Sequence, residues 1–88
     1  MEAKLLVEDV GGMPPHTNLY QLNKSLYGFL FVNVCAFPEV NQTFVVGCNH
    51  EGVVEEPSMM GIYHSEYVPH GQALEACGYR EVPIDGNF

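Results

Sequence analysis

A thiol, an imidazole and three carboxylates lie within nine residues in the stretch CNHEGVVEE, which runs from Cys48 to Glu56. Thiolate and imidazole are the donors that zinc prefers, and the other candidate ligands are His64, His70 and Cys77. Structural zinc sites usually take paired ligands two to four residues apart, and only Cys48 and His50 approach that spacing. The sequence therefore predicts no metal and no cofactor, with a small zinc-binding protein as an alternative.

The same residue types suggest cysteine catalysis or a carboxylate acid/base pair. A nucleophilic cysteine needs an electropositive setting or a helix N-terminus, which stabilises the thiolate. Cys35 falls inside an apolar run, Cys48 is followed by acidic residues, and Cys77 lies near the end of a predicted helix. The three glutamates of the stretch flank a polar turn, where water weakens shifts in their pKa. The sequence therefore predicts a protein that is not an enzyme.

Charge is the strongest signal in the composition. Eleven acidic residues stand against Lys4, Lys24 and Arg80, which gives a formal net charge of −8. Contacts to phosphate groups need Lys or Arg, so direct binding to nucleic acid or to an anionic membrane is not expected. The excess of acid instead favours a protein partner with a basic surface, such as one that normally holds nucleic acid. The alternative is that the charge only keeps the protein soluble.

A surface that binds a basic protein would combine carboxylates with tyrosines, which make rigid amphipathic contacts. Tyr63 and Tyr67 fall in the least regular part of the sequence, where binding residues are often found. The predicted partner-binding residues are Glu51, Glu55, Glu56, Tyr63, Glu66 and Tyr67. The alternative for the tyrosines is packing in the core.

The elements that would position these residues follow from apolar patterns and from glycine and proline. Strands are predicted at 4–10, 29–37, 43–48 and 79–82, with a short return strand at 53–54. The turn at 49–52 and a two-turn helix that ends before Gly78 complete the clear signals. Leu19, Leu22 and Leu26 have helix-like spacing, so 18–28 is expected to be one or two helical turns or an irregular excursion. Residues 58–68 are ambiguous between helix and loop.

These elements predict an α+β fold with a small antiparallel sheet of about four strands and one or two short helices. With 88 residues, the chain is expected to be a single domain, 1–88, with a loose tail at 83–88. Three cysteines without a CxxC motif, and the lack of a signal peptide or an apolar run of membrane length, predict a cytoplasmic protein. Edge strands can pair with other chains, so a structural or assembly subunit that forms a homo-oligomer is the alternative function.

The segment 43–82 resembles the C-terminal half of small bacteriophage-type accessory proteins. In these chains a short helix of the form A-L-x-x-x-G-Y leads into a terminal strand, and Ala73, Leu74, Gly78 and Tyr79 match that pattern. The resemblance implies an origin in a mobile element. Some small acidic phage proteins are inhibitors of host defence, including anti-CRISPR proteins, and they act by binding. A phage-encoded inhibitor that works in the host cytoplasm is the function that the resemblance implies.

Overall fold

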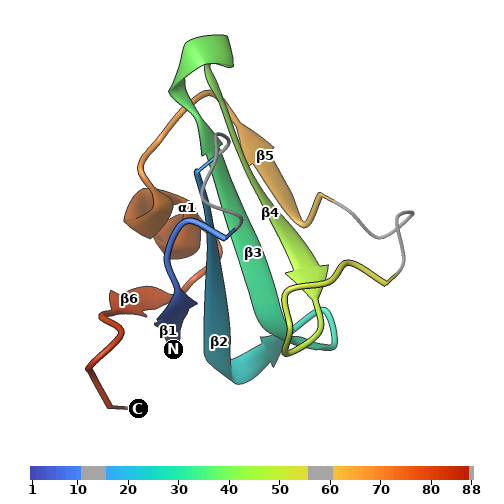
Figure 1. The fold of residues 1–88 in the computed structure, drawn as a ribbon, viewed down its shortest axis with the longest axis vertical. Helices are drawn as coiled ribbons and strands as arrows, with labels where there is room; N and C mark the ends of the chain where they lie inside the picture. The colour runs from blue at the N-terminus through green and yellow to red at the C-terminus, as the bar shows by residue number, and fades with distance from the viewer. Residues whose placement is uncertain (11–15, 56–60, 88) are drawn as a thin grey trace.

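The fold is a mixed β-sheet with one helix packed on a face, as Figure 1 shows. It was obtained as a computed structural model, which describes residues 1–10, 16–55 and 61–87. The elements are β1 (Glu2–Val7), β2 (His16–Leu26), β3 (Phe29–Phe37), the 3-10 helix η1 (Pro38–Val40), β4 (Gln42–Cys48), β5 (Tyr63–Ser65), α1 (His70–Ala76) and β6 (Arg80–Val82). The strand order is β5-β4-β3-β2-β1-β6, and all neighbours are antiparallel except β1 and β6.

The predicted fold class is wrong. Within the described residues six strands form one mixed sheet with a single α-helix, where about four antiparallel strands with one or two helices were expected. Two added strands and one pairing account for the difference. Residues 18–26 belong to the long strand β2, β5 forms within 58–68, and the last strand, β6, pairs in parallel with β1. Pairing in parallel is possible because α1 carries the chain from one edge of the sheet across to the other.

The helix-like spacing in β2 arises because this strand is buried on both faces. Tyr20 and Leu22 belong to the core on one face, and Leu19 is buried on the other. A strand that is covered on both sides loses the alternation of apolar and polar residues that would identify it. The pairing of β2 with β3 also changes register between Gln21 and Leu26, which disturbs the period of two further.

Other predicted elements are confirmed. The strand 29–37 is β3, and the expected helix is α1, followed by Gly78 with a positive φ of 91°. Gly52 also has a positive φ, and its amide N donates to the Asn49 carbonyl oxygen at 2.9 Å, so the predicted turn is present. The return strand expected at 53–54 does not form. Instead β5 pairs with β4.

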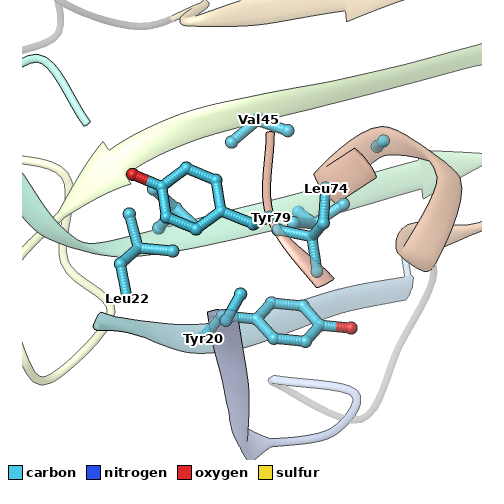
Figure 2. Close-up of a cluster of buried hydrophobic side chains, with 9 residues drawn as sticks. Tyr20, Leu22, Val45, Leu74 and Tyr79 are labelled. Atoms are coloured by element: carbon cyan, nitrogen blue, oxygen red, sulfur yellow. The ribbon is translucent and has the colours of Figure 1, made fainter. Parts of the chain in front are cut away.

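The main core lies between the sheet and α1. Its buried members are Ala3, Tyr20, Leu22, Val32, Val34, Val45, Ala73, Leu74 and Tyr79. Figure 2 shows that the rings of Tyr20 and Tyr79 lie in this cluster with their hydroxyl groups pointing to opposite ends. The Tyr79 hydroxyl donates to the Lys24 carbonyl oxygen at 2.7 Å. The Tyr20 hydroxyl donates to the Glu81 carboxylate and accepts from the Asn18 side-chain amide. Both phenols therefore fill the core without leaving a polar atom unpaired.

The other face of the sheet is covered by the segment after β4. The Asn33 side-chain amide donates to the Gly52 carbonyl oxygen at 2.8 Å, and Gly52 lies beside the Leu19 side chain. Val46 and Cys48 are buried on this face as well. Towards η1 the face is more open, because Phe37 and Phe44 are only half-buried there. None of the helices in the described residues has the length and apolar character needed to cross a membrane.

Candidate protein-binding surface

The residues predicted to bind a partner fall into two groups at opposite ends of β4. Glu51 and Glu55 are exposed beyond its C-terminal end, whereas Glu66 and Tyr67 are exposed near its N-terminal end, because β5 runs antiparallel to β4. Six steps along the seven residues of β4 at about 3.3 Å each separate the groups by roughly 20 Å. Glu56 lies outside the described residues. The structure therefore does not gather the predicted set on one small patch.

Tyr63 lies between the two groups and has a different environment. It pairs with Val45 across β4 and β5, and its half-buried side chain packs against the core on the face that α1 covers. The alternative of core packing therefore accounts for much of this side chain. Only its exposed part is available to a partner.

The segment that carries Glu66 and Tyr67 is held in place by Asn41, in the turn between β3 and β4, and by Thr43, in β4. The Tyr67 amide N donates to Asn41 Oδ1 at 3.2 Å. The Thr43 hydroxyl accepts from the Val68 amide N and donates to the Val68 carbonyl oxygen, both at 2.9 Å. Thr43 is fully buried, so these bonds are shielded from water. Glu66 and Tyr67 are thus presented on a fixed backbone beside η1.

Three aromatic rings extend across the half-open end of the sheet. Phe37 and Phe44 are stacked, with ring centroids 5.3 Å apart and planes 19° apart. Phe44 pairs with His64 on β5, and their ring centroids are 6.3 Å apart. Since Val45 and Tyr63 face α1, the alternation of side chains places Phe44 and His64 on the opposite face. The phenylalanine rings are half-buried and the histidine is exposed.

Three exposed residues follow these rings closely in the chain, and we call the rings and these residues together the η1-end surface. It consists of Phe37, Glu39, Phe44, His64, Glu66 and Tyr67. Sequence analysis predicted partner-binding roles for Glu66 and Tyr67 and did not single out the other four. Phe37 and Phe44 lie in strands that are apolar on both faces, and no sequence signal tells which end of such a strand stays open.

Charge is segregated between the two sides of the sheet. No Lys or Arg occurs from residue 25 to residue 79. Lys4, Lys24 and Arg80 belong to β1, β2 and β6, and Arg80 forms an ion pair with Glu2. The side of the sheet made by β3, β4 and β5 therefore has only carboxylates as its permanent charges.

The cysteines are in settings that disfavour the thiolate. Cys35 and Cys48 are buried in the sheet, and Thr17 Oγ1 donates to Cys35 Sγ at 3.5 Å. Burial raises the pKa of Cys35 and Cys77 above its ordinary value. Burial, assisted by repulsion from Cys35, raises the pKa of Cys48 to about 11. A protonated thiol is a poor nucleophile and a poor metal ligand.

The histidines considered as zinc ligands have other partners. His50 lies edge-on to Phe31 with ring centroids 6.3 Å apart, and His70 Nε2 is 2.9 Å from the His16 carbonyl oxygen. His64 belongs to the aromatic row described above. Over the ranges 1–10, 16–55 and 61–87, no three His, Cys, Asp or Glu side chains gather in a way that would hold a metal ion.

Comparison with models of protein families, with curated proteins and with solved structures finds no match to this chain. The resemblance of residues 43–82 to bacteriophage-type accessory proteins therefore stays a prediction. Function has to be inferred from the surface itself.

Proposed function

We propose that the protein is a non-enzymatic binding module that masks a basic surface of another protein, of the kind that normally holds nucleic acid. The observation that carries this proposal is the segregation of charge. The described glutamates within 25–79 are all exposed, and no cation of the same segment neutralises them; they are Glu39, Glu51, Glu55, Glu66 and Glu75. Such a field attracts a basic partner and repels nucleic acid and anionic lipid. On the sequence resemblance, the module is a phage-encoded inhibitor that acts in the host cytoplasm.

The settings of the reactive groups support a role without catalysis. The two buried cysteines have raised pKa values and are not exposed to a substrate. The exposed carboxylates of Glu51 and Glu66 lie at opposite ends of β4, too far apart to act as an acid/base pair on one substrate. Affinity for a partner needs no such pairing, since carboxylates spread over a surface act together on a basic one.

Capture of partners from a lysate on the immobilised protein tests this proposal. Two double variants, Glu39→Lys with Glu66→Lys and Glu51→Lys with Glu55→Lys, change the net charge equally but at opposite ends of β4. We expect a basic protein to be captured at low ionic strength and released at high ionic strength. At least one double variant should weaken its binding about tenfold, since each exposed ion pair contributes up to about 1 kcal/mol. Capture that responds neither to salt nor to either variant contradicts the proposal.

The alternative of a homo-oligomeric assembly subunit has one supporting observation. β5 and β6 form the two edges of the sheet, and an edge strand offers unpaired backbone groups to another chain. Two copies that met at β5, however, would bring exposed Glu66 residues together with no Lys or Arg nearby. Sedimentation at high protein concentration separates the cases, because a stable monomer contradicts assembly through either edge.

A further inference from the structure

We propose that Tyr27, at the tip of the hairpin between β2 and β3, is the residue that the protein inserts into an apolar pocket of its partner. This inference rests on the proposed function and names the side chain that anchors the basic partner. Three features of the hairpin support it: the backbone conformation of Tyr27, the exposure of its ring, and the hydrogen bonds that hold the strand beneath it.

The backbone at Tyr27 has a conformation that a tyrosine rarely adopts. Tyr27 and Gly28 form the two-residue turn between the strands, and their φ angles are 50° and 85°. A side chain is disfavoured at positive φ because its Cβ approaches the following carbonyl oxygen, and only the short polar side chains of asparagine and aspartate offset this by local hydrogen bonds. The fold alone would therefore be more stable with asparagine in place of Tyr27.

The ring of Tyr27 contributes little to packing within the chain. It is 76% exposed, the largest exposed fraction among the large apolar side chains of the described residues. Leu26, directly before it, packs against the core, so the turn separates a side chain that stabilises the fold from one that faces solvent. A tyrosine that lowers stability and packs against little has its explanation in contact with another molecule.

The strand beneath the turn is irregular, and hydrogen bonds hold it in place. The pairing of β2 with β3 changes register before Leu26. Within this stretch the Lys24 carbonyl oxygen accepts from the Tyr79 hydroxyl, and Asn23 Oδ1 accepts from the Glu2 amide N, both at 2.7 Å. Irregular pairing of this kind bends a strand and re-aims the side chains next to it. Because the strand is fixed at two points, binding at the tip has little conformational entropy to offset.

The position of the turn favours the basic partner as the occupant. Phe31 pairs with Cys48, so the hairpin turn and the turn after β4 lie at the same end of the sheet, away from η1, as Figure 1 shows. Glu51 and Glu55 are exposed at this end, and they outnumber Lys24, the one cation of the hairpin. An aromatic anchor with carboxylates at the same end suits an apolar pocket bordered by Lys or Arg. A second copy of the chain, with its net charge of −8, would bring carboxylates instead.

The basic protein captured from the lysate, once purified, is the probe, and biolayer interferometry with the full chain immobilised measures its affinity. We expect Tyr27→Asn to weaken binding about tenfold while it raises the melting temperature by about 2–8 °C. Tyr27→Phe keeps the ring and should lose only about threefold in affinity. Ile84→Asn is the matched control, because Ile84 is 55% exposed but lies in the tail after β6, so its affinity should not change.

The two measurements together separate an anchor from a structural residue. Replacing a structural residue lowers stability and affinity together, whereas replacing the anchor lowers the affinity of a protein that has become more stable. Unchanged affinity of Tyr27→Asn overturns the inference, as does a lower melting temperature or an equal loss of affinity in Ile84→Asn. Binding of the natural chain to phosphatidylcholine vesicles that is lost in Tyr27→Asn would assign the tip to a membrane and also overturns it.

Failure of the inference is distinguishable from failure of the proposed function. The proposed function stands without the anchor if capture of a basic protein is still lost at high ionic strength and on charge reversal. Failure of that capture test removes the proposed function and, with it, the role of Tyr27 as the anchor for a basic partner.

Discussion

Replacing Tyr20 with phenylalanine removes a single oxygen from the fully buried core. That oxygen accepts a hydrogen bond from Asn18 Nδ2 at 3.3 Å and donates one to the Glu81 carboxylate. A hydrogen bond to a charged group contributes about 1.5–3 kcal/mol, and the buried Asn18 amide would also lose a partner. We therefore expect the free energy of unfolding to fall by about 2 kcal/mol. For a domain of this size the melting temperature should drop by roughly 8–16 °C.

Urea unfolding followed by circular dichroism measures this loss, and Tyr79→Phe is the matched control. Tyr79 is buried in the same core, but its hydroxyl donates to a neutral backbone carbonyl, that of Lys24. Its removal should cost about 1 kcal/mol. A double-mutant cycle with Glu81→Ala should show that Tyr20 and Glu81 are coupled by at least 1 kcal/mol. A Tyr20→Phe protein as stable as the natural one, or more stable than Tyr79→Phe, would refute the reasoning.

Three further predictions concern stability. A methyl group added at Gly47 would overlap the Phe29 ring, so Gly47→Ala should lower the free energy of unfolding, measured with urea, by about 1–3 kcal/mol. Adding Phe29→Leu should restore part of this loss, and unchanged stability of Gly47→Ala contradicts the prediction. Tyr27 is 76% exposed and precedes Gly28 in a two-residue turn, where both residues have positive φ. Asparagine tolerates positive φ better, so Tyr27→Asn should stabilise the protein by about 0.5–1 kcal/mol, and a lower melting temperature argues against that geometry. Burial raises the pKa of Cys48 from 9.0 to about 11, so the unfolded chain ionises first. The contribution of Cys48 to stability should be constant below pH 9 and fall by about 2 kcal/mol towards pH 11. The fall in a Cys48→Ala protein should be smaller by that amount, and an unchanged slope would refute the assignment.

Sequence patterns were sufficient to predict an element whose structure depends mainly on its own residues. The run of apolar residues in Phe29–Phe37 and the glycine at 78 predicted β3 and the end of α1 correctly. They were insufficient where the structure depends on pairing between distant segments. Nothing within Arg80–Val82 indicates that it joins β1 in parallel, because that choice depends on the path of the chain over the sheet. The helix-like leucines of β2 show the same limit, since burial on both faces hides the period of a strand.

The candidate site shows a similar division. Composition predicted an acidic protein that does not bind nucleic acid directly, and residue types singled out Glu66 and Tyr67. The sequence could not show that the predicted residues are separated in space, with Glu51 and Glu55 at the other end of β4. Phe37, Phe44 and His64 come from three different strands, and only the sheet brings them together. A surface assembled across strands leaves no contiguous motif in the sequence.

The most direct test of the binding account compares the two charge-reversal variants against one captured basic partner at fixed ionic strength. At least one of the two double variants, Glu39→Lys with Glu66→Lys or Glu51→Lys with Glu55→Lys, should lose about tenfold in affinity, and because both have the same net charge a difference between them locates the contact. Equal affinity of both variants and the natural protein would contradict the account.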